Sequence, residues 1–188
     1  MQYKNIRRVH SGRYITTYHI AYETQNGHAK IYEMISRQPD MQTFDDLCHH
    51  APEAVVLILH DAAGERLLLN HEYRPATGEW VYNFPAGLME EGEEAEAAAK
   101  RELREETGLH LERIDEIWKE SYSAVGFSNE KCVVVVGTAG GTIQPSDSET
   151  EEIEAGWFTR AEVRELLSRA MFAARTQAYC ALWSRNPA

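Results

Sequence analysis

Residues 87–109 read GLMEEGEEAEAAAKRELREETGL, and the interpretation of the whole chain depends on this stretch. We predict a helix over residues 94–107 that ends at Gly108, because glycine suits the left-handed position after a helix. Glu105 and Glu106 follow Glu102 by three and four residues. A helix therefore places all three carboxylates within one turn and on one side.

Like charges at this spacing repel one another by roughly 0.2–0.5 kcal/mol per exposed pair. A divalent cation would offset the repulsion, because hard cations such as magnesium prefer carboxylate and carbonyl oxygens. The alternative is a glutamate-rich helix face that is simply solvated. The three glutamates alone leave both interpretations open.

The complete stretch resembles the Nudix box, with Gly87, Glu93 and the run Arg101–Leu109 at its defining positions. The resemblance implies a Nudix hydrolase, which cleaves a nucleoside diphosphate linked to another group. It also implies a role for each matching residue. The implied metal ligands are Glu102, Glu105, Glu106 and the carbonyl of Ala86. Glu93 and Arg101 are expected to pair and hold the loop on the helix; the alternative is an ordinary surface salt bridge worth under about 1 kcal/mol.

The composition is that of a single domain, or of one domain with a small appendage, since the chain has 188 residues and 43% of them are hydrophobic. We expect no membrane partner, because no apolar run reaches the length of a membrane span. The start of the chain lacks the apolar run of a secretory signal. The three cysteines are far apart and odd in number, which favours a reducing, cytoplasmic location.

The net charge of −11 is concentrated in two places. Residues 87–109 hold eight glutamates against three basic residues, a net of −5, and residues 147–154 hold five acids and no base, another −5. This pattern is expected for a cation-binding centre. It argues against nucleic acid as a partner, which needs a basic surface.

The remaining chain reads as strands with helices between and after them. A hairpin is predicted from 14–22 and 28–37 around Asn26-Gly27, followed by a polar connector up to residue 52. Further strands are predicted at 54–60, 66–73, 81–84, 114–122, 131–138 and 154–158. Thr159 and Glu162 are expected to form a capping box at the start of a helix. A final helix is predicted over 168–183. We therefore expect an α/β fold with a mixed sheet flanked by helices, an N-terminal β-hairpin region at 1–50, and the main domain at 51–188.

Three segments resemble the ADP-ribose pyrophosphatase branch of the Nudix family: residues 71–93, which lead into the box, and residues 121–130 and 170–183, which follow it. The resemblance implies an α+β Nudix fold, Mg²⁺ or Mn²⁺ as cofactor, a small nucleotide substrate, and a homodimer that exchanges the N-terminal region. Val125 stands where that branch usually has a proline. This departure extends the expected substrates from ADP-ribose to nucleoside diphosphate sugars in general.

A general base is also needed to take a proton from water. In this branch it usually lies on a late acidic loop, which makes Glu149, Glu151 and Glu152 candidates, with Asp147 less favoured and Glu102 as an alternative from the box. The loop could instead be mobile and solvated.

Two arginines are candidates for binding the substrate's phosphates. Arg74 matches a phosphate-contacting arginine of relatives, and Arg37 is a second candidate from the N-terminal region.

The predicted function is Mg²⁺-dependent hydrolysis of the pyrophosphate bond of a nucleoside diphosphate sugar. The alternatives are hydrolysis of a GDP-linked sugar, a dinucleotide or a free nucleotide, and a non-catalytic sensor that binds such a molecule.

Overall fold

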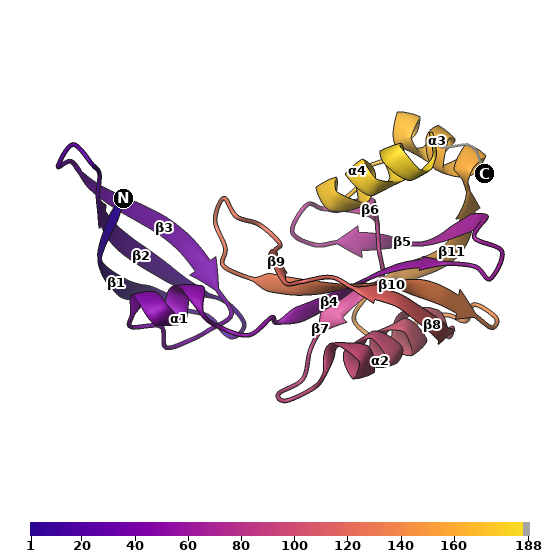
Figure 1. The fold of residues 1–188 in the computed structure, drawn as a ribbon, viewed down its shortest axis with the longest axis horizontal. Helices are drawn as coiled ribbons and strands as arrows, with labels where there is room; N and C mark the ends of the chain where they lie inside the picture. Colours follow the sequence, from indigo (N-terminus) through magenta and orange to yellow (C-terminus); the bar gives the residue numbers. More distant parts are fainter. Residues whose placement is uncertain (186–188) are drawn as a thin grey trace. The chain divides into compact units, whose positions relative to one another are not determined.

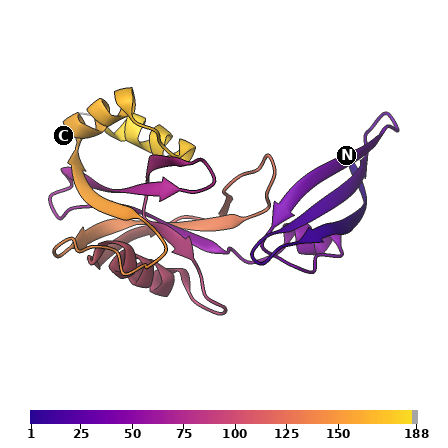
Figure 2. The same ribbon diagram turned by 180° about the vertical axis from the view of Figure 1, so that it is seen from behind.

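A computed structural model describes residues 1–185 of the chain (Figures 1 and 2). The described chain forms two compact units. Unit 1 contains Met1–Glu53 and Glu120–Cys132, and unit 2 contains Ala54–Lys119 and the chain from Val133 onward. The segment 120–132, which the sequence analysis placed in the main domain, thus has its contacts in unit 1.

Unit 1 is built on a three-stranded antiparallel sheet of order β1-β2-β3. Its strands are β1 (Gln2–Ser11), β2 (Thr16–Glu23) and β3 (Ala29–Ser36). The predicted hairpin is formed by β2 and β3, and Gly27 in its turn has a φ of 79°, a conformation that glycine adopts without strain. A small core forms around Tyr18, Ile20, Met34 and Met41.

Two elements of unit 1 were missed from the sequence. β1 was not predicted because all but two of its residues are exposed, so it lacks an alternating apolar pattern. The supposed connector contains a short helix, α1 (Phe44–Cys48), which has no buried residue. Thr43 and Asp46 form a capping box at its start, a local signal that the polar composition concealed.

The segment from Glu120 to Cys132 is attached to β3 by backbone contacts. Ile35 N donates to Phe127 O at 2.8 Å, and the Tyr32 hydroxyl donates to Gly126 O. A short strand, β9 (Ser121–Tyr122), pairs with Lys131 and Cys132 at the start of β10 (Lys131–Gly140). These contacts hold the segment 120–132 within unit 1.

Unit 2 has the predicted mixed sheet, with strand order β11-β5-β4-β10-β8, β6 beside β5 and β7 beside β4. The strands are β4 (Ala54–His60), β5 (Arg66–Arg74), β6 (Glu79–Asn83), β7 (Ala86–Leu88), β8 (His110–Ile117), β10 (Lys131–Gly140) and β11 (Ile153–Thr159). The apolar run at 54–60 is fully buried at five consecutive positions, as expected for a central strand.

Helix α2 (Ala95–Thr107) covers one face of this sheet, while α3 (Arg160–Arg169) and α4 (Ala174–Trp183) lie on the opposite face (Figure 1). α2 packs Ala98, Ala99 and Leu103 into the core formed with β4, β5 and β10. It ends where predicted, at Gly108, whose φ of 71° allows its N–H to donate to Arg104 O. No helix between residues 1 and 185 has the length and apolar character needed to cross a bilayer.

Three predictions for unit 2 were wrong in detail. The single helix at 168–183 is interrupted at 170–173, where Tyr82 N donates to Met171 O and Ala173 N donates to Tyr82 O. This pairing with β6 is a tertiary contact that local sequence does not reveal. The strand predicted at 114–122 lies at 110–117, and residues 86–88, predicted as loop, form β7.

Candidate functional site

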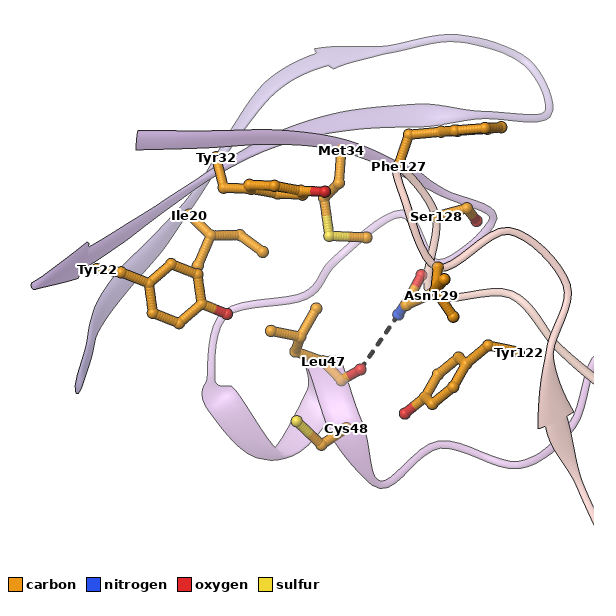
Figure 3. A pocket seen from close by; sticks show the side chains of 11 residues that line it. Ile20, Tyr22, Tyr32, Met34, Leu47, Cys48, Tyr122, Phe127, Ser128 and Asn129 are labelled. Atoms are coloured by element: carbon orange, nitrogen blue, oxygen red, sulfur yellow. Dashed lines mark hydrogen bonds between the residues drawn. The ribbon is translucent and has the colours of Figure 1, made fainter. Parts of the chain in front are cut away.

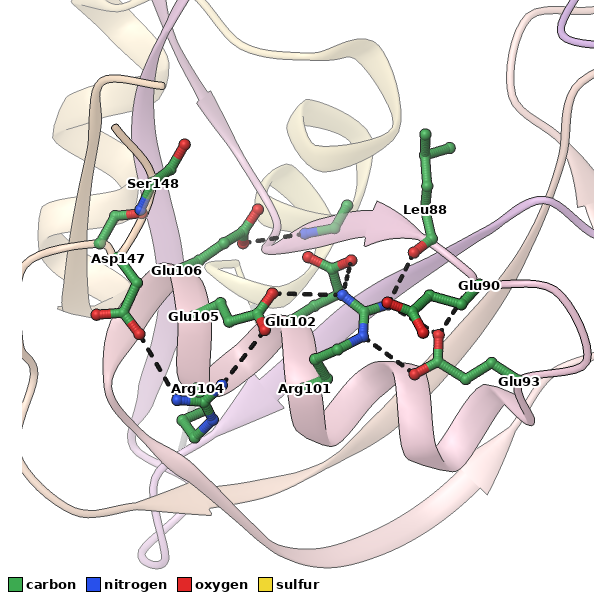
Figure 4. Close-up of polar contacts among 12 residues, drawn as sticks. Leu88, Glu90, Glu93, Arg101, Glu102, Arg104, Glu105, Glu106, Asp147 and Ser148 are labelled. Carbon is green, nitrogen blue, oxygen red and sulfur yellow. Dashed lines mark hydrogen bonds and ion pairs between the residues drawn. The ribbon is translucent and has the colours of Figure 1, made fainter. Parts of the chain in front are cut away.

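Unit 2 contains an acidic cavity of about 390 Å³ at the C-terminal end of α2. It is lined by one basic residue, two serines and five acids: Arg104, Ser146, Ser148, Glu102, Glu105, Glu106, Asp147 and Glu151. Figure 4 shows most of these side chains and their polar contacts. The three glutamates predicted as metal ligands therefore meet in one cavity.

Glu106 is the most buried of these acids, with a relative exposure of 8%. Its Oε2 accepts hydrogen bonds from Asn70 Nδ2 at 2.8 Å and from Ala86 N at 3.3 Å. Burial, together with the charges of Glu102 and Glu72, raises the pKa of Glu106 to about 8 even though both hydrogen bonds oppose the shift. The two hydrogen-bond donors to Glu106 therefore do not compensate the negative charge of the carboxylates around it.

Glu102 lies against the start of the box. A Cβ added to Gly87 would be 1.9–2.2 Å from the carboxylate atoms of Glu102, so only glycine allows this approach. Burial raises the pKa of Glu102, the neighbouring Arg101 opposes the shift, and Glu105 and Glu151 add to it. Glu151 also lines the cavity together with the three box glutamates, so the late acidic loop reaches them.

Arg101 joins the loop to the helix. Its Nε and Nη2 donate to the two carboxylate oxygens of Glu93 at 3.0 and 2.8 Å, and Nη2 also donates to Leu88 O. Its Nη1 lies 2.7 Å from Glu102 and 3.3 Å from Glu105. The guanidinium therefore fixes the loop and balances part of the charge of two cavity acids (Figure 4).

The loop between β10 and β11 is tied to the last turn of α2. Gln144 N donates to Thr107 O at 2.9 Å, and Asp147 N donates to Glu105 O at 2.8 Å. All three glutamates considered as general base are exposed, and of the three only Glu151 lines the cavity. These backbone contacts bring the acidic loop to the site.

The donor set fits a hard divalent cation, because the cavity offers several carboxylates and one of them is buried with a raised pKa. Between residues 1 and 185, no three acidic, histidine or cysteine side chains already surround one point as ligands. Two of the three glutamates bond Arg101 and the third bonds Asn70. Ala86 contacts Glu106 through its N–H.

The two candidate phosphate-binding arginines lie elsewhere. Arg74 in unit 2 pairs with Glu72 at 3.2 Å and does not line the acidic cavity. Arg37 belongs to unit 1, where it pairs with Glu130 at 3.0 Å. Neither is brought to the acidic cavity by the contacts within its own unit.

Two polar residues behind Glu106 were missed by the sequence analysis. Asn70 and Glu72 lie on β5 with relative exposures of 1% and 8%, and Glu72 Oε1 accepts from Asn83 Nδ2 at 3.0 Å. A signal was present, since Asn70 directly follows the apolar run of residues 67–69 in the strand predicted at 66–73. A polar residue in a buried strand is informative because it needs a partner.

Unit 1 contains a second cavity, of about 210 Å³ (Figure 3). Four aromatic rings and the amide of Asn129 contribute to its lining, together with Ile20, Met34, Leu47, Cys48, Val125 and Ser128; the rings are those of Tyr22, Tyr32, Tyr122 and Phe127. No carboxylate of the described residues lines it. We call it the aromatic cavity, and its surface suits uncharged, planar groups.

Comparison with known proteins places this site in a family. A family model of the NUDIX domain matches residues 49–179. The 8-oxo-dGDP phosphatase NUDT18 of Mus musculus is 31% identical over 110 residues, which cover 58% of this chain and 32% of that protein. The ADP-sugar pyrophosphatase of Mus musculus is 52% identical over 44 residues, covering 23% of this chain and 20% of that protein. The chain thus spans less than half the length of these two relatives.

Among solved structures, an ADP compounds hydrolase superposes with a TM-score of 0.72 at 22% identity, over 98% of this chain and 93% of that one. This likeness establishes the fold. Together with the matched domain, which spans the acidic cavity and its helix, it identifies the chain as a member of the Nudix family.

Proposed function

We propose that this protein hydrolyses the pyrophosphate bond of a nucleoside diphosphate sugar, such as ADP-ribose, with Mg²⁺ or Mn²⁺ as cofactor. The products would be a nucleoside monophosphate and a sugar phosphate. The observation that carries the proposal is the acidic cavity, in which Glu102, Glu105 and Glu106 meet Glu151. The names of two similar proteins, an ADP-sugar pyrophosphatase and an ADP compounds hydrolase, favour an adenine nucleotide.

In this proposal Glu102, Glu105, Glu106 and the carbonyl of Ala86 hold the cation. A divalent cation in such a site neutralises phosphate oxygens and lowers the pKa of bound water. Arg101 keeps the loop of Glu93 on the helix, and therefore keeps Ala86 near Glu106.

We assign the general base to Glu151. It lines the same cavity as the three glutamates, and its charge affects Glu102. Glu149 does not line this cavity, and the backbone carbonyl of Glu152 accepts from Tyr73 N at the edge of the sheet. A general base must be within reach of the water that it deprotonates, and Glu151 meets that requirement better than its neighbours.

The proposed reaction is tested by product identity. The protein is incubated with Mg²⁺ and with ADP-ribose, ADP-glucose, GDP-mannose, UDP-glucose and dinucleotides in turn, and the products are separated by anion-exchange chromatography. We expect a nucleoside monophosphate and a sugar phosphate from an ADP-linked sugar. Saturable binding without turnover of any compound would instead favour a sensor.

The base assignment is tested by three matched variants of one loop. Glu151→Gln should lower kcat by about 10²–10⁴-fold. Glu149→Gln and Glu152→Gln, which change the same charge two and one residues away, should stay near wild type. If kcat fell strongly in Glu149→Gln or Glu152→Gln but little in Glu151→Gln, the role of general base would be assigned to that other residue.

We also propose that the protein is a homodimer that exchanges its N-terminal region. The sheet of unit 1 has β1 at one edge, while β3 at the other edge contacts the segment 120–132, and an edge strand such as β1 offers unpaired backbone groups to a second chain. Multi-angle light scattering should give twice the chain mass of 21.4 kDa. A mass equal to that of one chain at all concentrations would contradict the dimer.

A further inference from the structure

The buried amide of Asn70 lies directly behind Glu106. Asn70 is on β5 with a relative exposure of 1%, after three leucines whose exposure is 0%. Its Nδ2 donates to Glu106 Oε2 at 2.8 Å. An amide at this depth, directly after three buried leucines, needs a specific explanation, because buried polar groups require hydrogen-bond partners.

The hydrogen bonds to Glu106 are asymmetric. Asn70 Nδ2 and Ala86 N, from β5 and β7, both donate to Oε2. Within residues 1–185, Glu106 Oε1 receives no hydrogen bond. Two donors from different strands fix the rotation of the planar carboxylate and leave Oε1 as the oxygen available to a ligand in the cavity.

The arrangement has a structural cost. Asn70 Oδ1 is buried and has no hydrogen-bond partner in the described part of the chain. Turning the amide around would place Oδ1 against the carboxylate of Glu106, so the contact with Glu106 determines the orientation of the amide. An apolar residue would avoid the unpaired acceptor, but it would also remove one of the two donors to Glu106.

We propose that Asn70 is a positioning residue that holds Glu106 in the orientation needed to bind a divalent cation. This inference rests on the proposed function, since it assumes a cation among the box glutamates. Asn70 itself need not touch the cation or the substrate. It acts as an outer partner that orients a ligand, a role that commonly affects metal affinity.

The test is the affinity of the purified protein for Mn²⁺, measured as free Mn²⁺ by electron paramagnetic resonance without substrate. Asn70→Leu should bind Mn²⁺ about ten- to a hundred-fold more weakly than wild type. Its Tm in EDTA serves as the folding check, because the substitution removes the unpaired Oδ1 but also one of the two donors to Glu106. Asn70→Val, which suits a strand and is smaller, serves as a second variant if leucine disturbs the packing.

Asn129→Leu is the matched control. Asn129 is also buried, with a relative exposure of 6% and an unpaired Oδ1, but it lies in unit 1. The Asn129→Leu substitution should leave the affinity for Mn²⁺ unchanged. Wild-type Mn²⁺ affinity in folded Asn70→Leu and Asn70→Val would overturn the role of Asn70 and leave the metal site intact. Failure of the wild type to bind Mn²⁺ would overturn the proposed cofactor, and with it this inference.

Discussion

The two cavities differ in chemistry. The aromatic cavity of unit 1 has four rings and no carboxylate among the described residues in its lining, whereas the acidic cavity of unit 2 has five acids and one arginine. Packed rings stabilise a fold at any pH, whereas carboxylates near one another destabilise it unless a cation or a proton compensates them. We therefore expect unit 2 to respond to pH and to metal, and unit 1 to respond to changes in packing and hydrogen bonding.

The largest expected difference between the units is the effect of pH on metal-free protein. Glu106 has a pKa of about 8 in the folded chain and an ordinary value of 4.5. Between these values the folded state retains a proton that the unfolded state releases, so stability falls as pH rises from about 5 to about 8. The loss is on the order of 5 kcal/mol in the free energy of unfolding.

The measurement is urea unfolding in EDTA at pH 5, 6.5 and 8, followed by tryptophan fluorescence. All four tryptophans lie in unit 2, at positions 80, 118, 157 and 183, so the signal reports on that unit. Glu106→Gln should make the pH dependence much flatter. The same slope in wild type and variant would show that Glu106 does not titrate in this range.

Turnover should depend on the same carboxylate. Glu106→Gln removes the negative charge but keeps the size of the side chain, and it should lower kcat by about a thousand-fold, equal to about 4 kcal/mol. Glu96→Gln is the control, because Glu96 is exposed on the same helix and pairs with Lys100. Near-normal activity of Glu106→Gln would refute its role as a ligand.

The contrast between the units also explains what could be predicted from sequence. In unit 2 the predictive signals are local: the apolar run at 54–60, the glycine that ends α2, and three glutamates on one helical turn. In unit 1, β1 is exposed on both faces and α1 buries no residue, so neither has a hydrophobic period to detect.

The remaining site residues depend on contacts between distant parts of the chain. Asn70 meets Glu106 only because β5 lies beside α2, and Glu151 reaches the cavity only because the loop is hydrogen-bonded to the helix end. The sequence left three loop glutamates open as candidates, and of these only Glu151 lines the acidic cavity. Residue types and spacing predict candidate metal ligands, whereas the tertiary structure is needed to find the distant side chains that contact them.

A smaller effect in unit 2 is expected from a single methyl group. Gly87→Ala would place a Cβ 1.9 Å from Glu102 Cδ, and the flexible end of that side chain would have to move. Displacement of a catalytic group by about 1 Å can lower kcat on the order of a hundred-fold. Tm should change little, because the movement is confined to one carboxylate.

A double variant sharpens this prediction. If the methyl group acts only through Glu102, Gly87→Ala combined with Glu102→Ala should lose no more activity than Glu102→Ala alone. Additive losses would mean that Gly87 has a separate effect on the loop.

The smallest expected effect lies in unit 1 and should not reach the acidic cavity. The Tyr18 hydroxyl donates to Gln38 O at 2.7 Å and accepts from Met41 N at 3.1 Å, and the residue is fully buried. Tyr18→Phe leaves both backbone groups without this partner and should destabilise unit 1 by about 2 kcal/mol. Hydrogen exchange read by mass spectrometry should show faster exchange in peptides from β2 and β3. Because the two hydrogen-bond partners of the hydroxyl, Gln38 and Met41, belong to unit 1, the Mn²⁺ affinity of the acidic cavity should stay at the wild-type value. A weaker Mn²⁺ affinity in Tyr18→Phe would show that the two units are energetically coupled, and the contrast drawn between their cavities would then be incomplete.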